Sequence, residues 1–248
     1  MAQGLGAEDR GAEDRGADDH GAEDRGGAGR PGLFVTFEGG DGSGKSTQAA
    51  LLEEWLTAQG RTVVRTREPG GTDLGDELRE IVLHRRGHMA PRAEALIYAA
   101  DRAHHVATLV RPALARGGIV IQDRYLDSSV AYQGAGREID GGEIRDLSLW
   151  AAEGLLPDLT VLLDLDPAVG RTRLDAARTR YDRLEAEAAE FHGRVRDAYV
   201  DLAAAEPERF LVLDATLPAE EIAAAIRDRV AGRLGDRPRQ GPAVGGAR

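Results

Sequence analysis

The chain has 248 residues and a formal net charge of -11, and 42% of its residues are hydrophobic. This length accommodates one large domain or two small ones, and the acidic balance disfavours non-specific binding to nucleic acid. No apolar run reaches the length that spans a bilayer, so no membrane partner is expected. The chain lacks cysteine, which excludes disulfides and thiolate metal sites. With no secretory signal pattern, we expect a cytoplasmic protein.

The N-terminal segment repeats a five-residue unit. Residues 6–25 run GAEDR, GAEDR, GADDH and GAEDR, with no hydrophobic side chain larger than alanine. Such a segment cannot bury enough apolar surface to offset the entropy cost of ordering it. We therefore expect residues 1–31 to form a disordered acidic tail, and a binding tail is the weaker alternative. Residues 235–248 are expected to be a second loose end, which leaves residues 32–234 as the folded domain.

Within the expected domain, short apolar runs alternate with segments of helical periodicity. The expected strands are 33–38, 62–66, 119–123, 159–165 and 210–213. The expected helices include 45–59, 91–109 and 219–234, with Pro112 bending or restarting the second of them. Near-continuous apolar strands separated by helices indicate a three-layer α/β fold with a five-stranded parallel sheet. Ligands of such sheets bind at the carboxyl ends of the strands.

A glycine-rich segment, GGDGSGKS, lies between the first expected strand and the first expected helix. It matches G-x-x-x-x-G-K-[ST], the P-loop pattern, in the required strand–helix context. Its backbone N–H groups would converge on phosphate oxygens at a helix N-terminus. We expect Lys45 to reach the β- and γ-phosphates of ATP and Ser46 to offer its hydroxyl to Mg²⁺. The expected cofactor-binding residues are Gly39, Gly40, Asp41, Gly42, Ser43, Gly44, Lys45, Ser46 and Thr47. The motif predicts a P-loop NTPase fold.

The expected strand 119–123 ends in a carboxylate, Asp123, and Arg124 follows it directly. Many buried strands end in aspartate, but beside a P-loop such a group can hold Mg²⁺ directly or through water. The guanidinium of Arg124 would emerge at the same strand end, where its planar fork suits phosphate. Lys45, Asp123 and Arg124 are therefore the first catalytic candidates.

Other polar segments have two interpretations each. The segment TREPGGT leaves the second expected strand, and its Pro and Gly residues need specify only a turn, which leaves Arg67 and Glu68 unexplained. Tyr98 and Arg102 share one helix face, and core packing plus a surface charge fits that spacing equally well. A dense basic stretch is typical of a solvated helix face, an interpretation we prefer for its first two members. It contains Arg171, Arg173, Arg178, Arg180 and Arg183.

Six segments together resemble bacterial thymidylate kinases, over most of residues 33–230. They are FEGGDGSGKST, TREPGGT, EALIYAADR, QDRYLDSSVAYQGAGR, GLLPDLTVLLDLDP and DRLE. Any P-loop enzyme could share the first, whereas TREPGGT followed by DRY-x-DSS-x-AYQG is much more specific. The resemblance implies phosphoryl transfer from ATP to dTMP, giving ADP and dTDP, with Mg²⁺ as cofactor. It also implies a homodimer.

The resemblance further implies a role for each matching residue. Asp41 takes the place of an acidic group near the sugar 3′-hydroxyl of the acceptor. Tyr98 takes that of an aromatic stacking on thymine, and Arg102 that of an arginine reaching a base carbonyl. Arg124 matches an acceptor-phosphate arginine, and Tyr132 is the expected barrier to a 2′-hydroxyl. The other matching acceptor positions are Arg67, Glu68 and Arg79 near sugar and phosphate, with Ser129 and Gln133 lining the nucleoside pocket.

The P-loop differs from that of some family members, which carry an arginine next to the glycine before Gly-Lys. Here Gly42 or Ser43 occupies that place, so we expect the compensating charge from a helical lid over about residues 176–186. This pattern is typical of the bacterial type. It adds Arg178, Arg180 and Arg183 to the catalytic candidates.

Three alternatives to this assignment stay open. Another nucleoside monophosphate or deoxynucleoside kinase is the first, although TREPGGT and the DRY-x-DSS segment argue against it. A nucleotide-binding switch of the GTPase kind would carry an N-K-x-D motif, which the sequence lacks. A degenerate, non-catalytic relative is the third, yet Lys45, Ser46, Asp123 and Arg124 are all present. The apolar pattern over residues 96–110 does not separate a dimer interface from core.

Overall fold

The computed structural model describes residues 32–85, 87–177 and 181–235. The expected acidic tail at 1–31, residues 236–248 and two of the expected lid arginines, Arg178 and Arg180, lie outside the described residues. Gly235, which we assigned to the loose C-terminal end, is the last residue of the final helix. In the described part of the chain, no helix combines the length and the apolar character needed to cross a membrane.

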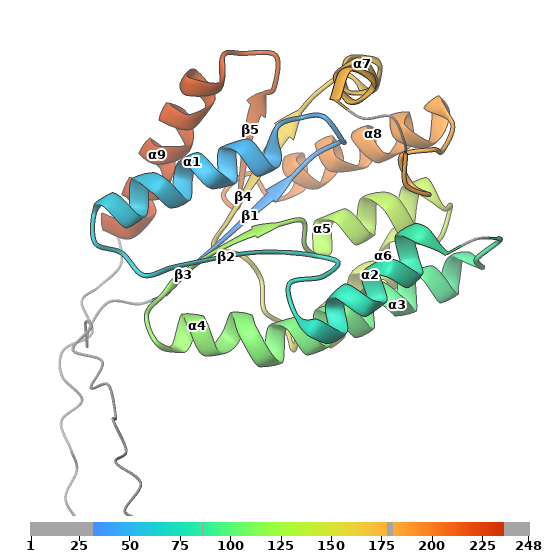
Figure 1. Cartoon of the computed structure of the whole chain (residues 1–248), viewed down its shortest axis with the longest axis horizontal. Helices are drawn as coiled ribbons and strands as arrows, with labels where there is room; N and C mark the ends of the chain where they lie inside the picture. Colours follow the sequence, from blue (N-terminus) through green and yellow to red (C-terminus); the bar gives the residue numbers. More distant parts are fainter. Residues whose placement is uncertain (1–31, 86, 178–180, 236–248) are drawn as a thin grey trace, which may run out of the picture.

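Five parallel strands form the centre of the fold (Figure 1), in the spatial order β2-β3-β1-β4-β5. They are β1 (Leu33–Glu38), β2 (Val63–Arg67), β3 (Ile119–Asp123), β4 (Leu159–Asp164) and β5 (Phe210–Asp214). The central strand, β1, pairs with β3 and β4 and is buried along its whole length. Helices exclude water from both of its faces, which explains its largely apolar sequence. The predicted five-stranded parallel sheet is confirmed.

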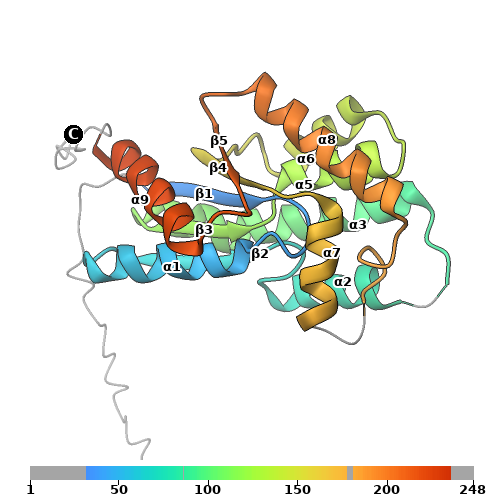
Figure 2. The ribbon, with the colours of Figure 1, turned by 90° about the horizontal axis from the view of Figure 1, so that it is seen from above.

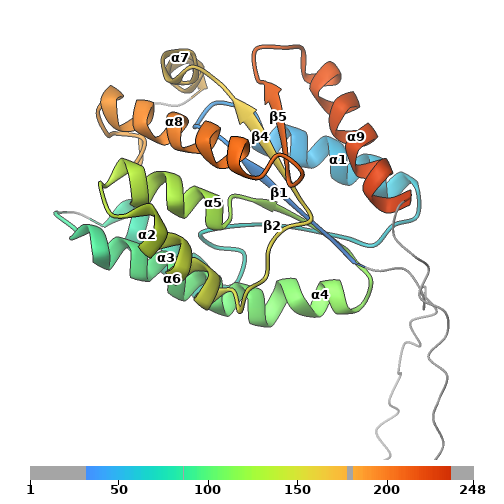
Figure 3. The same cartoon turned by 180° about the vertical axis from the view of Figure 1, so that it is seen from behind.

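Helices cover both faces of the sheet. Figure 2 shows α1 (Lys45–Ala58) and α9 (Ala219–Gly235) side by side on one face. Figure 3 shows the helices of the opposite face from behind. The remaining helices are α2 (Asp73–His84), α3 (Pro91–His105), α4 (Arg111–Ala115), α5 (Leu126–Ser129), α6 (Gly141–Ala151), α7 (Pro167–Ala177) and α8 (Ala189–Ala205).

The side chains of β1 pack into two separate cores because successive residues of a strand point to opposite faces. Leu33, Val35 and Phe37 pack in the core beneath α1 and α9. Phe34 packs in the other core with Val110 of the segment that precedes α4. The P-loop follows β1 directly, so its position is fixed by a strand that is anchored on both sides.

Two π-helical segments depart from our expectation of regular helices. The long helix expected over residues 91–109 leaves the α-helical form after His105 and continues as η1 (Val106–Val110). Pro112 then lies in the first turn of α4, where its missing N–H costs nothing, so it restarts the helix as expected. The second segment, η2 (Val130–Gly136), was not expected. Such π-turns are frequent at functional sites, and η2 carries two of the expected acceptor residues.

Candidate active site

A cavity of about 490 Å³ lies at the carboxyl ends of the central strands. This volume falls within the range of small-molecule sites. Most of the expected site residues line it together: Asp41, Gly42, Gly44, Lys45, Ser46, Thr47, Arg67, Glu68, Arg79, Tyr98, Arg102, Asp123, Arg124, Ser129, Tyr132 and Gln133. Gly39 and Gly40 line a smaller cavity beside it. The expected donor-binding and acceptor-binding residues therefore surround one space.

The P-loop wraps tightly because its glycines adopt backbone angles that other residues avoid. Gly42 has φ 77°, and a side chain there would come within 2.6 Å of the Gly170 carbonyl oxygen in α7. Lys45 Nζ folds back over the loop and donates to the carbonyl oxygens of Gly39 (3.0 Å) and Gly40 (2.8 Å). Burial, with the nearby charge of Arg124, lowers the pKa of Lys45 to about 8. A phosphate in the loop would favour the charged ammonium.

The two expected magnesium ligands lie together. Ser46, at the start of α1, donates its hydroxyl hydrogen to Asp123 Oδ2 at the end of β3, over 2.8 Å. A hydroxyl and a carboxylate are oxygen donors, the kind of ligand that Mg²⁺ takes while keeping several waters or phosphate oxygens. These two residues therefore fit a magnesium ion carried by a triphosphate.

Arg124 adopts a left-handed backbone conformation with φ 66°, which is uncommon for a residue with a side chain and typical of functional sites. Its Nη2 donates to Asp41 Oδ1, its Nη1 donates to Gly39 O at 3.1 Å, and its guanidinium lies 4.9 Å from the centre of the Tyr132 ring. Burial alone would raise the pKa of Asp41, but Arg124 and Lys45 hold it at about 2. The carboxylate of Asp41 is therefore ionised and fixes the arginine over the P-loop.

Arg102 is a buried guanidinium, so its interpretation as a surface charge is wrong. It is 1% exposed. Its Nε donates to Glu68 Oε2 (3.0 Å), Nη1 to Ser148 Oγ (3.0 Å) and Nη2 to Ser129 Oγ (3.1 Å). Nη2 also lies 3.0 Å from Glu68 Oε2, so four of the five N–H donors of the guanidinium face partners. The remaining N–H, on Nη1, can serve a carbonyl group in the cavity, which Tyr98 lines from one turn earlier on α3.

Sequence reasoning missed the imidazole that supports this arginine. His105 Nδ1 lies 3.0 Å from Glu68 Oε1, and His105 Nε2 lies 2.8 Å from Thr66 Oγ1. Glu68 therefore bridges His105 and Arg102. The one available signal was spacing, since Tyr98, Arg102 and His105 follow one another at helical intervals of four and three residues.

The ionisation of Asp101 makes the folding stability of the protein depend on pH. It is buried, and its carboxylate accepts a hydrogen bond from Gly70 N–H at 3.3 Å. Burial, with repulsion from Glu68, raises the pKa of Asp101 from 3.8 to about 7. The folded state thus keeps a proton that the unfolded state has released, so this group's contribution to folding falls as pH rises from about 4 to about 7 and is constant above that.

Replacing Asp101 with asparagine removes this titration while keeping an acceptor oxygen for Gly70. We expect the melting temperature of Asp101→Asn, relative to wild type, to rise steadily between pH 4.5 and 7 and then to level off. Parallel thermal unfolding of the two proteins across pH 4.5 to 8.5 measures this difference. A difference that does not change with pH would show that Asp101 is ionised throughout.

The remaining expected arginines lie apart from the P-loop contacts. Arg67 Nη2 contacts Asp76 Oδ1 at 3.3 Å and Arg79 Nη1 donates to Pro69 O at 2.9 Å, and both side chains line the cavity. Arg183 lines neither described cavity. Its Nη2 contacts the buried Glu94 carboxylate at 2.6 Å, and its Nε donates to a backbone carbonyl of α2. A catalytic role for Arg183 stays a prediction.

Two arginines that we preferred as solvated charges also make specific contacts. Arg173 lines the cavity and donates to the carbonyl oxygens of Gly42 (3.3 Å) and Ala215 (3.0 Å). Arg171 donates to Glu185 O at 2.9 Å, and its guanidinium lies 3.8 Å from the centre of the Tyr181 ring. Both residues are exposed, as the solvated-face interpretation expects, and Arg173 in addition joins α7 to the P-loop.

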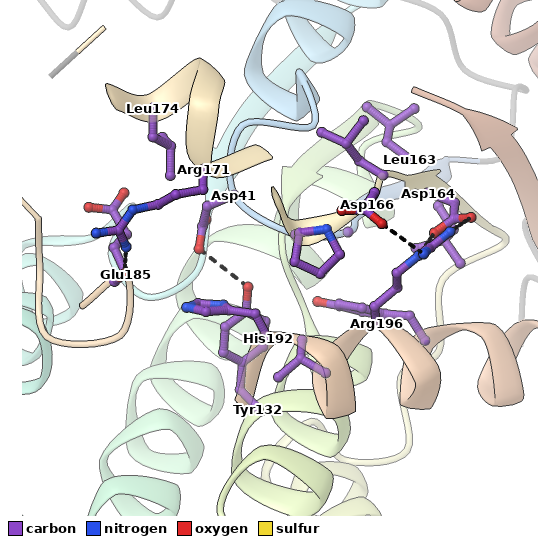
Figure 4. Close-up of a pocket in the computed structure, with 17 residues that line it drawn as sticks. Asp41, Tyr132, Leu163, Asp164, Asp166, Arg171, Leu174, Glu185, His192 and Arg196 are labelled. Atoms are coloured by element: carbon purple, nitrogen blue, oxygen red, sulfur yellow. Dashed lines mark hydrogen bonds and ion pairs between the residues drawn. The ribbon is translucent and has the colours of Figure 1, made fainter. Parts of the chain in front are cut away.

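The smaller cavity, of about 50 Å³, lies behind the P-loop between β4 and α8. Figure 4 shows the Tyr132 hydroxyl directed at Asp41, with the His192 ring beside the pair; the two oxygens are 3.4 Å apart. Arg196 binds both oxygens of Asp164, at 2.7 and 3.0 Å. A space of this size holds a few water molecules but no nucleotide.

Comparisons with known proteins agree on one family. The family model described as thymidylate kinase matches residues 37–226. The thymidylate kinase of Leifsonia xyli subsp. xyli is 77% identical over 205 residues, which span 83% of this chain and 97% of that protein. The thymidylate kinase of Clavibacter sepedonicus is 77% identical over 198 residues, 80% of this chain and 94% of that protein.

A solved structure gives the same result for the fold. The crystal structure of thymidylate kinase from Ehrlichia chaffeensis superimposes with a TM-score of 0.66 at 33% sequence identity. The match covers 81% of this chain and 99% of that chain. The similarity therefore extends over nearly the whole of the solved enzyme.

Proposed function

Because the chain belongs to the thymidylate kinase family, we propose that it transfers the γ-phosphoryl group of ATP to the phosphate of dTMP, giving ADP and dTDP. The observation that carries this proposal is that one cavity is lined by a P-loop and by the Tyr98–Arg102 pair. The P-loop suits a triphosphate, and an aromatic ring beside a donor-only guanidinium suits a base that carries carbonyl groups. Another nucleoside monophosphate kinase is the runner-up, and it would need a different partner for the base.

The donor end of the cavity is built for the phosphates of ATP. Backbone N–H groups of the P-loop and the ammonium of Lys45 would meet the β- and γ-phosphate oxygens. Ser46 and Asp123 would hold Mg²⁺, which supplies positive charge against the developing phosphate charge when bound. Lys45 and Arg124 add their own charges to that neutralisation.

The acceptor end needs positioning more than acid–base chemistry, because an ionised phosphate oxygen is already a nucleophile. Arg124, held by Asp41, would bind the acceptor phosphate and align it with the γ-phosphorus. Tyr98 would stack on thymine, and the remaining N–H of Arg102 would meet the O4 carbonyl. Tyr132, next to Asp41, would occupy the space that a ribose 2′-hydroxyl requires.

Tyr98 tests this acceptor site directly. Stacking on an aromatic ring contributes about 1–3 kcal/mol per base, so Tyr98→Ala should lower kcat/KM for dTMP about 5- to 150-fold. Tyr98→Phe keeps the ring and serves as the matched control, with kcat/KM expected within threefold of wild type. Both are measured by coupled assay at saturating ATP. If Tyr98→Ala is as active as wild type, the base does not stack on Tyr98 and must bind elsewhere in the cavity.

We propose, in addition, that two copies of the chain form a homodimer through α3 and α6. These helices pack against each other, and each exposes a large apolar side chain, Leu96 (58% exposed) and Trp150 (78% exposed). Exposed aromatic and aliphatic groups on neighbouring helices favour a protein partner over water. A cytoplasmic location stays a prediction from the sequence, which lacks cysteine and a secretory signal pattern.

A further inference from the structure

Glu38 is a buried carboxylate that the proposed transfer does not use. It is the last residue of β1, directly before the P-loop, and it is fully buried. It receives three hydrogen bonds. Tyr125 N–H donates to Oε1 at 2.8 Å, while the hydroxyls of Ser128 and Tyr199 donate to Oε2 at 2.6 and 2.8 Å. Burial, with repulsion from Asp127, raises the pKa of Glu38 to about 7, whereas the hydroxyls of Ser128 and Tyr199 and the charge of Arg124 favour its ionised form.

All three donors belong to the surroundings of Arg124. Tyr125 directly follows Arg124, whose φ is 66°, so one oxygen of Glu38 fixes the backbone just after the strained residue. Arg124 Nη1 lies 3.3 Å from Ser128 Oγ and 3.3 Å from Tyr199 OH. The other oxygen of Glu38 therefore holds the two hydroxyls that receive the guanidinium.

The direction of these hydrogen bonds is set by the ionised form of Glu38, which predominates above its pKa of about 7. A guanidinium has only donors, so Ser128 and Tyr199 must present lone pairs to Arg124. They do so because both hydroxyl hydrogens are used within one cluster, in which each hydroxyl oxygen lies within hydrogen-bond distance of Glu38 Oε2 and the two lie 2.7 Å from each other. The carboxylate thereby sets the orientation of both hydroxyls toward the arginine.

We propose that Glu38 is a positioning residue for Arg124, which it holds by the backbone through Tyr125 and by the guanidinium through Ser128 and Tyr199. This inference rests on the proposed role of Arg124 in binding the acceptor phosphate. Glu38 lines neither of the two described cavities. Its effect on catalysis must pass through the arginine.

Glutamine is a sharp test because it keeps the size of the side chain and replaces one acceptor by a donor. If the amide NH₂ faces Ser128 and Tyr199, one hydroxyl can donate to the other, but the second must turn its hydrogen toward the donors of Arg124. If it faces Tyr125 N–H instead, two donors meet there. Either orientation leaves a buried mismatch beside Arg124, so Glu38→Gln should lower kcat/KM for dTMP about 10- to 100-fold.

A double-mutant cycle with Arg124→Gly separates positioning from a general effect on the fold. Glycine adopts φ 66° without strain, so this change removes the guanidinium and leaves the backbone path. In the Arg124→Gly background we expect Glu38→Gln to change kcat/KM by less than twofold. If Glu38→Gln instead costs the same factor in both backgrounds, Glu38 acts independently of Arg124 and the proposal is overturned.

Two further variants complete the experiment. Tyr199→Phe removes one hydroxyl without introducing a donor; it should give a smaller loss that also vanishes with Arg124→Gly, and it keeps the test available if Glu38→Gln fails to fold. Thr36→Val is the matched control, since it breaks a buried hydrogen bond of β1 to Thr160 (3.0 Å) without approaching Arg124. It should keep kcat/KM within twofold of wild type.

The same set distinguishes the two ways of failing. If Arg124→Gly has the kcat/KM of wild type, Arg124 does not bind the acceptor phosphate, and the proposed acceptor site is wrong. If kcat/KM is lowered in Arg124→Gly but normal in Glu38→Gln, the proposed acceptor site stands and only the positioning role of Glu38 is overturned.

Discussion

Replacing Lys45 with alanine is expected to lower kcat by about 10²- to 10³-fold while the fold is kept. The ammonium is the P-loop's one side-chain cation, and it already lies over the loop through the carbonyl oxygens of Gly39 and Gly40. Loss of one charge that stabilises the transition state costs roughly 3–4 kcal/mol. Single-turnover formation of dTDP at saturating ATP and dTMP measures the effect on chemistry alone.

Lys45→Met provides the matched control for this prediction. Methionine fills nearly the same apolar volume beside the P-loop and lacks only the charge, so it should be as inactive as Lys45→Ala and at least as stable. If either variant turns over near the wild-type rate, the charge of Lys45 does not contribute to phosphoryl transfer.

Replacing Arg124 with glycine should reduce kcat/KM for dTMP by about 10²- to 10³-fold, comparable with the loss of a transition-state donor. The reason is the loss of the guanidinium that Asp41 and the Tyr132 ring hold in the cavity. Because glycine relaxes the left-handed backbone at φ 66°, the melting temperature should not fall through strain. Steady-state kinetics and thermal unfolding of the same sample separate the two effects.

Arg124→Lys is the informative comparison for that variant. Lysine keeps a positive charge but lacks the planar fork that binds a phosphate at two oxygens. We expect it to recover part of the activity of Arg124→Gly and to remain well below wild type. Full activity of Arg124→Lys would mean that charge alone suffices and that the geometry around Arg124 is unimportant.

The sheet was predictable because its signal is local. Four of the strands are largely apolar runs bounded by glycines, charged residues or helical segments, whereas β2 reads VVRTR; β1 and β3 have the expected bounds. The π-turn at Val106–Val110 was not predictable, because its residues have ordinary helical periodicity and only packing distinguishes the two forms. The same holds for η2, whose sequence gave no sign of a wider turn.

The residues of the site were predictable to the extent that a motif or a helical spacing marks them. Lys45, Ser46 and Asp123 lie in such motifs, and the structure brings them to one cavity. The partners of Arg102 were not predictable, since Ser129 and Ser148 are 27 and 46 residues away in the sequence. Glu38 reads as the end of a strand, and its partner Tyr199 is 161 residues away.

The central claim is that this cavity phosphorylates dTMP in preference to other nucleoside monophosphates. One coupled assay of ADP release with dTMP, dUMP, dCMP, dGMP and dAMP, at equal concentrations and saturating Mg-ATP, tests it most directly. The donors of Arg102 match the O4 carbonyl of thymine but oppose the amino group of cytosine, a buried mismatch of about 1–3 kcal/mol. We therefore predict a kcat/KM for dTMP about 5- to 150-fold above that for dCMP, and above those for both purines. A kcat/KM for dCMP or for a purine equal to or greater than that for dTMP would contradict the account.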